Sequence, residues 1–193
     1  RAANYSPEES RRDAMALATM LRTVYECPKP VIARIQGNAF GGGVGLIAAC
    51  DIAFGVHSAL FSLSEVKLGI IPSAISPYVV NAIGARQASR YFLTAERFTA
   101  SEAYRIGLLH DLSTVVEGVD ELIAQSLASL LGNGPQAMSE AKVLIRAVTN
   151  KGVTEAVVND TVDRISRVRA GAEAKEGMSA FLEKRRPSWA SRV

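Results

Sequence analysis

Four glycines within five positions limit the fold of this chain more than any other feature. The triplet at residues 41–43 and Gly45 stand between a β-branched run at 31–35 and a helix-forming apolar run at 46–50. This order predicts a strand, a glycine loop and a buried helix, which together are typical of an α/β protein. Because glycine has no Cβ, other groups can approach such a loop closely, and the free N–H groups of the following helix favour negative charge. Close packing of the helix on the strand explains the glycines equally well.

The chain divides near residue 117 into an α/β part and a helical part. Apolar spacing predicts an amphipathic helix over residues 7–26, with Ser6 and Glu9 forming a capping box at its start. After the glycines, the pattern predicts strands at 51–56, 60–63 and 108–116, and helices at 76–84, 86–93 and 100–107, the last capped by a box of Thr99 and Glu102. From residue 119 the periodicity is helical. We therefore expect an α/β core over residues 1–116 and a helical region over residues 117–193.

The composition is that of a globular protein rather than a membrane, fibrous or disulfide-rich one. Hydrophobic residues make up 48% and charged residues 21%, and the apolar run at 44–56 is interrupted by Asp51 and too short to cross a bilayer. Cys27 and Cys50 suit a reducing compartment. The net charge of +3 is too dispersed to indicate nucleic-acid binding. We expect a cytoplasmic protein with neither a membrane nor a nucleic-acid partner.

One carboxylate lies in unusually apolar surroundings. Glu65 is part of the stretch at residues 61–72, which is otherwise rich in Leu, Ile, Val and Phe. Such surroundings suit a general acid or base that works near neutral pH. An ion pair with Lys67, or simple exposure to water, is the alternative explanation.

Other kinds of site find less support. Residues 43–48 fit the G-x-G-x-x-A pattern of dinucleotide-binding loops, and Glu65 follows at a suitable distance, but residues 36–42 separate this pattern from its strand. A phosphate-binding Walker loop would need a Gly-Lys-Ser/Thr tripeptide after the glycines, and none follows. His57 and His110 have no partners at metal-ligand spacing, so we expect no metal site.

Taken together, the sequence resembles the enoyl-CoA hydratase/isomerase (crotonase) superfamily. The resemblance rests on the glycine triplet with the positions on both sides of it, on Glu65 with the residues after it, and on two later stretches. These positions are Ile32, Ala33, Ile35, Gln36, Gly37, Gly41, Gly42, Gly43, Ala48, Cys50, Asp51, Ile52, Glu65, Gly69, Pro72, Leu93, Thr94 and residues 103–108 and 176–185. A match at so many constrained positions is specific, and it covers essentially the whole chain.

The resemblance implies a fold and a chemistry. The family fold is a spiral of ββα units with a C-terminal helical part, here residues 117–193, which builds trimers and often hexamers. In the family, two backbone N–H groups hold the oxygen of an acyl-CoA thioester while enolate-like charge develops on it. Gly42 matches the second of these donors, and Glu65 matches a catalytic glutamate.

The resemblance also implies the residues that bind the substrate. Phe181 and Lys184 match positions near the adenine and phosphate end of coenzyme A, which are often contributed by a neighbouring subunit. The remaining candidates for substrate binding are Ala39, Phe40, Ile70, Pro72 and Tyr78. Coenzyme A is part of the substrate, so no separate cofactor and no metal are expected.

Two departures from the family pattern bear on the reaction. Family hydratases with two catalytic glutamates place the first where this chain has Gly45, which leaves Glu65 as the one family-type carboxylate. The family's N-terminal segment, with its early strands and first oxyanion donor, is missing from these residues.

Gly45, with residues 64–67 and 75–79, makes the chain most similar to bacterial methylglutaconyl-CoA hydratases. This similarity favours hydration of 3-methylglutaconyl-CoA or a related branched acyl-CoA, as in leucine degradation. A Δ3,Δ2-enoyl-CoA isomerase that uses a single glutamate and a non-catalytic acyl-CoA-binding homologue are the alternatives. We expect Gly45→Glu to raise the hydration of crotonyl-CoA, provided that the larger side chain fits.

Overall fold

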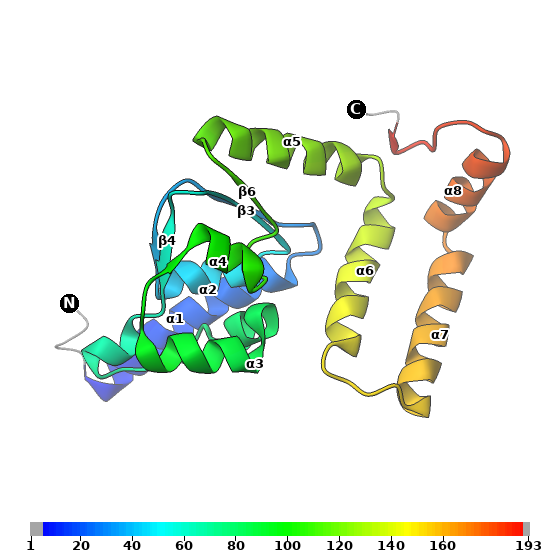
Figure 1. Ribbon diagram of the computed structural model, residues 1–193. Helices are drawn as coiled ribbons and strands as arrows, with labels where there is room; N and C mark the ends of the chain where they lie inside the picture. Colours follow the sequence, from blue (N-terminus) through cyan, green and yellow to red (C-terminus); the bar gives the residue numbers. More distant parts are fainter. Residues whose placement is uncertain (1–5, 191–193) are drawn as a thin grey trace. The chain divides into compact units, whose positions relative to one another are not determined.

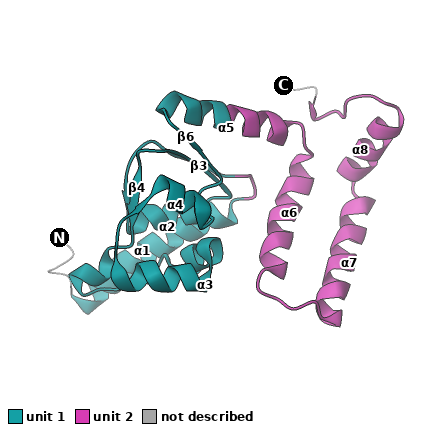
Figure 2. Cartoon of the chain, viewed as in Figure 1, with its two compact units in different colours: residues 1–27, 31–123 teal, residues 28–30, 124–193 magenta. Residues whose placement is uncertain are grey.

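A computed structural model describes residues 6–190 and divides them into two compact units (Figures 1 and 2). Unit 1 contains residues 6–27 and 31–123, and unit 2 contains residues 28–30 and 124–190. The division falls inside helix α5 (Val116–Leu131), whereas the change in sequence periodicity lies at its start. Each unit is described by itself.

Helix α1 (Pro7–Glu26) begins and ends where its sequence predicts. Both halves of the capping box form: the Glu9 N–H donates to Ser6 Oγ at 3.2 Å, and the Ser6 N–H donates to Glu9 Oε2 at 2.8 Å. Leu21 is the fully buried residue of this helix and anchors it to the core of unit 1. Pro28 cannot continue the helical hydrogen bonding, so the helix ends just before it.

Two small sheets form the β layer of unit 1. The first contains β1 (Ile32–Ile35), β3 (Ile52–Val56) and β6 (Asp111–Ser113), all parallel, in the order β1-β3-β6. The second contains β2 (Ala39–Phe40), β4 (Leu60–Ser62) and β5 (Phe98–Thr99), with β2 parallel and β5 antiparallel to β4. The expected α/β class is confirmed. The sequence did not predict β2, and β6 is shorter than the strand expected at 108–116.

After α1, the helices of unit 1 alternate with the strands along the chain. The glycine stretch opens α2 (Gly42–Ala49), and the short 3₁₀ helix η2 (Glu65–Leu68) follows β4. Helix α3 (Ser76–Thr94) is kinked at Gly84, which has φ 74° and ψ 155°, so the prediction of two short helices on either side of this point is confirmed. Helix α4 (Ala100–Arg105) has only half of its expected capping box, because Thr99 accepts from the Glu102 N–H while the Glu102 carboxylate binds Arg105 and Tyr91.

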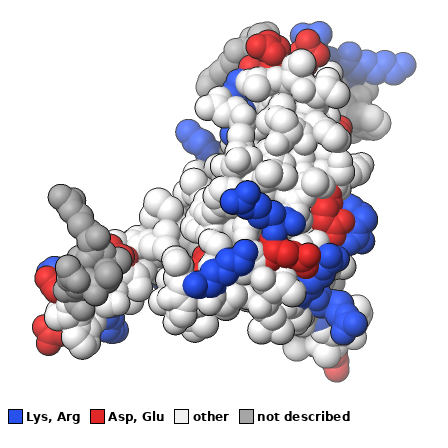
Figure 3. All heavy atoms as spheres, turned by 60° about the vertical axis from the view of Figure 1, so that its left-hand side comes forward, with Lys and Arg blue, Asp and Glu red and all other residues white. Residues whose placement is uncertain are grey.

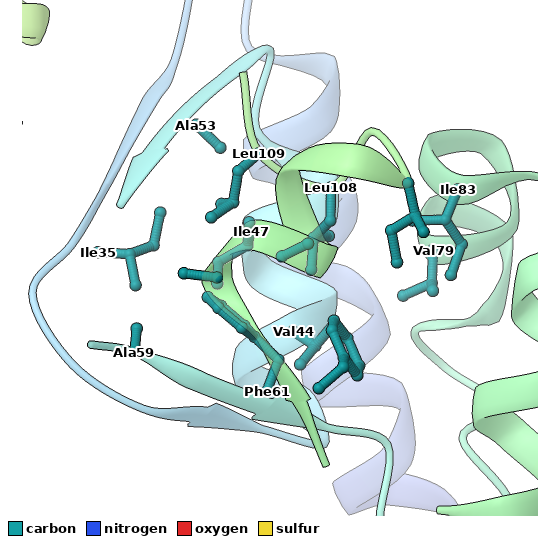
Figure 4. Packing of buried hydrophobic residues seen from close by; sticks show 14 of the residues in the cluster. Ile35, Val44, Ile47, Ala53, Ala59, Phe61, Val79, Ile83, Leu108 and Leu109 are labelled. Carbon is teal, nitrogen blue, oxygen red and sulfur yellow. The ribbon is translucent and has the colours of Figure 1, made fainter. Parts of the chain in front are cut away.

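The core of unit 1 surrounds α2. Val44 and Ile47 of this helix lie among side chains from β4, from α3 and from the segment after α4 (Figure 4). Val44, Phe61 and Val79 are completely buried. A fully buried side chain of this size stabilises the fold by about 1.5–3 kcal/mol relative to an exposed one. The core therefore holds α2, and with it the glycine turn at its start, in a fixed position.

Unit 2 is built from helices. These are the C-terminal part of α5, then α6 (Pro135–Val148), α7 (Glu155–Ala170) and α8 (Ala172–Leu182). The Glu173 carboxylate of α8 accepts hydrogen bonds from the Gln136 and Ala137 N–H groups at 3.0 and 2.7 Å and so caps α6. This cap satisfies two N–H groups that a helix start leaves without partners.

The surface and helix lengths add two observations. On the face drawn in Figure 3, acidic and basic side chains lie next to one another rather than in separate areas. Unit 1 also contains salt bridges between neighbouring charged side chains, such as Arg90–Glu96 and Arg105–Glu102. Between residues 6 and 190, no helix combines the length and the apolar character that a membrane span needs.

Candidate active site

The glycine turn lies at the junction of β2 and α2. Gly41 has φ 50° and ψ −117°, a conformation that glycine adopts far more readily than other residues. Its N–H donates to the Ser62 carbonyl at 2.9 Å, which ties the turn to the end of β4. Its carbonyl accepts from the Val44 and Gly45 N–H groups at 3.0 and 3.2 Å, which starts the helix.

Glu65 lies against this turn. A Cβ built on Gly41 would be 2.9 Å from Glu65 Oε1, so a side chain at position 41 would displace the carboxylate. Residue 65 begins η2, and Gly69, in the left-handed region with φ 71°, ends it. The start of η2 thus directs the carboxylate of Glu65 at the start of α2.

One oxygen of this carboxylate is buried without a hydrogen bond. Among the described residues, Glu65 Oε2 is the buried side-chain polar atom that has no partner. Leaving a buried acceptor unpaired costs about 1–3 kcal/mol, and more for a charged group, so such an atom in a folded protein calls for an explanation. A group that exchanges protons with a bound ligand provides one.

Gly42 has a backbone N–H at the start of α2, next in sequence to the glycine that the Glu65 carboxylate contacts. It is the first residue of α2, and its exposed Cα side is open, since a Cβ there would meet nothing within 4 Å. The first N–H groups of a helix have no intrahelical partner, and Gly41 supplies no side chain to cap them. The N–H of Gly42 can therefore donate to an oxygen on which negative charge develops.

Four of the predicted binding residues lie on two segments, the strand before the glycine turn and the stretch after η2. Ala39 and Phe40 form β2, directly before Gly41, and the Arg97 guanidinium lies over the Phe40 ring at 5.5 Å from its centroid. Ile70 and Pro72 follow η2, with Ile70 exposed and Pro72 buried.

Tyr78 has a structural role that its sequence did not indicate. It lies on α3, and its ring meets the ring of Tyr25 of α1 edge to face at a centroid distance of 5.3 Å. Burial is the main cause that raises the pKa of the Tyr78 hydroxyl above its usual value. The contact joins α1 to α3, and a role of Tyr78 in binding substrate stays a prediction.

Phe181 and Lys184 belong to unit 2, at the end of α8 and just beyond it. The Phe181 side chain is 82% exposed, and Lys184 has φ 56°. Glu65 and Gly42 belong to unit 1, so the contribution of these two residues to a shared site also stays a prediction.

The expectation for Gly45 needs correction. Gly45 is buried, and a Cβ there would overlap Ile75 Cγ2 and lie 2.5 Å from Ile75 Cβ. A glutamate therefore does not fit at position 45 while Ile75 keeps its place, and Gly45→Glu alone is expected to disrupt packing instead of raising activity. The structure does not support the G-x-G-x-x-A interpretation, because Gly43 and Gly45 lie inside α2 while the turn is at Gly41.

Sequence reasoning missed two residues of this site, Gly41 and Ile75. The sequence shows Gly41 as part of the glycine triplet, but nothing in the sequence indicates that Glu65 lies against it. No pattern in the sequence pointed to Ile75. Within residues 6–190, no group of three or more His, Cys, Asp or Glu residues could hold a metal ion.

The comparison with known proteins now decides the family. The model of the family described as "Enoyl-CoA hydratase/isomerase" matches residues 2–192. The chain belongs to the enoyl-CoA hydratase/isomerase family. A solved structure of an enoyl-CoA hydratase from Shewanella pealeana is 41% identical, with a TM-score of 0.93 over 97% of this chain and 70% of that one. This likeness confirms the expected crotonase fold.

Two curated members of the family show the range of named activities among similar proteins. An enoyl-CoA hydratase from Alternaria alternata is 34% identical over 90% of this chain and 58% of its own length. A peroxisomal Delta(3,5)-Delta(2,4)-dienoyl-CoA isomerase from Arabidopsis thaliana is 31% identical over 96% of this chain and 66% of its own length. The chain thus spans about three fifths of the length of the Alternaria relative.

Proposed function

We propose that this chain carries the acid/base group and one oxyanion donor of an enoyl-CoA hydratase. The observation that carries the proposal is the Glu65 carboxylate, which lies against Gly41 with one buried oxygen unpaired, at the open start of α2. A carboxylate beside free helix N–H groups is the combination that proton transfer next to a thioester requires. Membership of the enoyl-CoA hydratase/isomerase family supports an acyl-CoA as substrate.

In the proposed reaction, one carboxylate handles both proton transfers. Glu65 takes a proton from water as the water oxygen bonds to C3 of the 2-enoyl-CoA, and the electron pair of the double bond moves towards the thioester oxygen. The Gly42 N–H donates to that oxygen as its negative charge grows, an interaction commonly worth about 10²–10³ in rate. The proton held by Glu65 then passes to C2, which gives the 3-hydroxyacyl-CoA and restores the carboxylate.

Within this reaction class, we propose 3-methylglutaconyl-CoA or a related branched acyl-CoA as the substrate. Such an acyl chain carries its own distal carboxylate, which crotonyl-CoA lacks. A second group that can accept a hydrogen bond from the attacking water would help to hold the water in a near-attack position. Because Ile75 covers Gly45, helix α2 does not supply that group at this position.

A Δ3,Δ2-enoyl-CoA isomerase is the second candidate function. Moving a proton from C2 to C4, or back, needs one base, and Glu65 is the carboxylate that lies against the glycine turn. The similarity to the Arabidopsis dienoyl-CoA isomerase supports this candidate.

Product mass separates the candidates. The complete protein is incubated with 3-methylglutaconyl-CoA, crotonyl-CoA and a 3-enoyl-CoA, and each product is separated from its substrate by chromatography and analysed by mass spectrometry. Hydration adds the mass of one water to either of the first two substrates and should be faster with the carboxylated one. A 3-enoyl-CoA converted to a 2-enoyl-CoA at unchanged mass, without hydration, would contradict the hydratase proposal and support the isomerase. Binding without turnover of any of them would leave a non-catalytic acyl-CoA-binding protein.

We further propose that the protein is a cytoplasmic homotrimer or a hexamer formed by two trimers. Large apolar side chains of unit 2 are exposed: Val158, Val162 and Ile165 follow one another along α7 at helical spacing, and Leu182 ends α8. Neither Cys27 nor Cys50 is part of a disulfide, as is usual in a reducing compartment. Sedimentation analysis of the complete protein tests the assembly, and Val162→Asp should lower the measured mass.

A further inference from the structure

Ile75 lies against α2 one turn beyond the point where Glu65 does. Positions 41 and 45 are four residues apart, a spacing that places them on the same side of a helix. The Glu65 carboxylate lies next to Gly41, and the Ile75 side chain lies next to Gly45. Glu65 begins η2 and Ile75 directly precedes α3, so both residues reach α2 from the segment that joins β4 to α3.

Ile75 is held firmly in this place. Its side chain is 2% exposed, and its carbonyl accepts from the Tyr78 and Val79 N–H groups at 3.1 Å each, which opens α3. The preceding turn is closed by Ser76, whose N–H and Oγ both donate to the Ser73 carbonyl, at 3.2 and 2.8 Å. Moving Ile75 away from Gly45 would require the start of α3 to shift as well.

We propose that Ile75 determines the substrate specificity of this site. Its side chain excludes any side chain from position 45, so α2 cannot bring a second acid to the side of the helix on which Glu65 works. The acyl chain must then supply the second polar group, which selects chains that carry a distal carboxylate. This inference rests on the proposed hydration.

The contact distances define how the exclusion can be relieved. A Cβ on Gly45 would overlap Ile75 Cγ2, lie 2.5 Å from Ile75 Cβ and lie 3.5 Å from Ile75 Cα. Alanine at position 75 removes the first conflict and keeps the second. Glycine at position 75 removes both and leaves an ordinary van der Waals contact. Rescue of a substitution at position 45 should therefore be partial with Ile75→Ala and larger with Ile75→Gly.

The first experiment measures stability without any substrate. Gly45→Ala in the complete protein should lower the midpoint of thermal unfolding by about 5 °C or more, because the core around position 45 has no room for it. Gly43→Ala is the matched control on the same helix, since its Cβ would lie at an ordinary 3.6 Å from Ala39 Cβ. The loss caused by Gly45→Ala should shrink in an Ile75→Ala background and shrink further in an Ile75→Gly background.

The second experiment measures specificity. The ratio of kcat/KM for crotonyl-CoA to kcat/KM for 3-methylglutaconyl-CoA is determined for Ile75→Gly and for Gly45→Glu/Ile75→Gly, which share the same cavity. A glutamate that reaches the water beside Glu65 should raise this ratio by about 10-fold or more, within the usual range for one acid/base group.

The outcomes are distinguishable. The role of Ile75 would be overturned if Gly45→Ala were as stable as the parent protein. It would also be overturned if the decrease in unfolding midpoint caused by Gly45→Ala were the same in the Ile75→Ala and Ile75→Gly backgrounds as in the parent. Stability coupling with an unchanged substrate ratio would confirm the Ile75–Gly45 contact and overturn the specificity role. If the parent protein hydrates neither acyl-CoA, the proposed function fails and the specificity role fails with it, whereas the stability data still report on the Ile75–Gly45 contact.

Discussion

At the scale of single residues, the positions of the Glu65 carboxylate and of the Gly42 N–H both depend on one residue, Gly41. The Glu65 carboxylate can lie where it does because Gly41 has no Cβ, and the Gly42 N–H is exposed because Gly41 makes the turn that starts α2. Position 41 therefore sets the geometry of both groups, although it contributes no functional atom of its own.

Removal of the charge on Glu65 is expected to affect turnover and leave the fold intact. Glu65→Gln keeps the shape of the side chain and removes its ability to exchange a proton. The rate of hydration should fall by about 10²–10⁴, the usual contribution of a general acid or base. Steady-state kinetics and acyl-CoA binding are measured together, and near-parental kcat would end the assignment of Glu65.

A side chain at Gly42 should also act on turnover more than on stability. The Cβ of Gly42→Val would meet no described atom within 4 Å, so the protein has room for it. It would project into the open space at the start of α2, where the thioester oxygen of the proposed substrate would approach the N–H. We expect a loss of kcat with a small change in unfolding midpoint, and an equal loss of both would assign the triplet to packing alone.

The polar network around Glu102 gives a prediction for pH dependence. Hydrogen bonds, first from Arg105 and then from Tyr91, lower the pKa of Glu102 from 4.5 to about 2. Burial and the Glu102 carboxylate raise the pKa of Tyr91 to about 12. A carboxyl whose folded pKa is lowered stabilises the fold above its unfolded pKa and loses that contribution as the pH falls through the folded value.

Glu102→Gln should therefore be less stable than the parent at pH 7, by about 1–3 kcal/mol, as is typical for hydrogen bonds to a charged group. This difference should narrow as the pH falls from about 4.5 to about 2. Urea unfolding at several pH values measures it, with Glu121→Gln on α5 as a control outside the network. A difference independent of pH would show that the charge of Glu102 does not matter.

At the scale of elements, the ends of helices explain much of what the sequence could predict. The box of Ser6 and Glu9 satisfies N–H groups at the start of α1 through bonds that are local in sequence. Gly84 marks the kink of α3 in the same local way.

Ser6→Ala is the direct test of such a local signal. Loss of the cap should lower the free energy of unfolding by about 1 kcal/mol. Ser10→Ala, three residues into α1, is the control and should be neutral or slightly stabilising because alanine favours helices. Equal effects of both changes in thermal unfolding would contradict the role of the cap.

Contacts between distant segments are what the sequence could not predict. The two-residue strand β2 exists because Ala39 and Phe40 pair with Phe61 and Ser62, and two residues carry no periodicity of their own. The contact of Ile75 with Gly45 joins residues 30 positions apart and is set by how α3 packs on α2. Glu65 was predicted from its residue type in apolar surroundings and Gly42 from the resemblance to the family, and their catalytic roles stay predictions. The contacts of Gly41 and Ile75 depend on shape and left no such signal in the sequence.

At the scale of the whole molecule, residues 28–30 belong to unit 2 although more than 90 residues of unit 1 separate them in sequence from the rest of that unit. Residues 28–30 pack with unit 2, while the residues on both sides of them pack in unit 1. Lys142 of α6, although charged, is buried, and its Nζ donates to the Lys29 carbonyl at 3.0 Å. Pro28 and Pro30 also line a groove of about 490 Å³ with apolar residues of α5 and with Trp189.

A fragment that contains residues 124–193 alone should consequently be less stable than the same residues in the complete protein. It would lose the carbonyl acceptor of Lys142 and one wall of the apolar groove. Hydrogen exchange of α6 measures the difference, and addition of a peptide covering residues 27–31 should restore part of the protection. Equal protection in fragment and protein would contradict a structural role for residues 28–30.

The interleaved chain path also orders events during synthesis. The ribosome makes residues 28–30 before most of unit 1, and the helices of unit 2 emerge only after about 100 further residues, several seconds later at typical rates of translation. Until then, residues 28–30 lack the helices of unit 2 with which they pack, whereas unit 1 can already fold. Unit 2 can therefore be completed only after residues 31–123 of unit 1 have been made, and its assembly closes a loop of the chain that contains all of these residues.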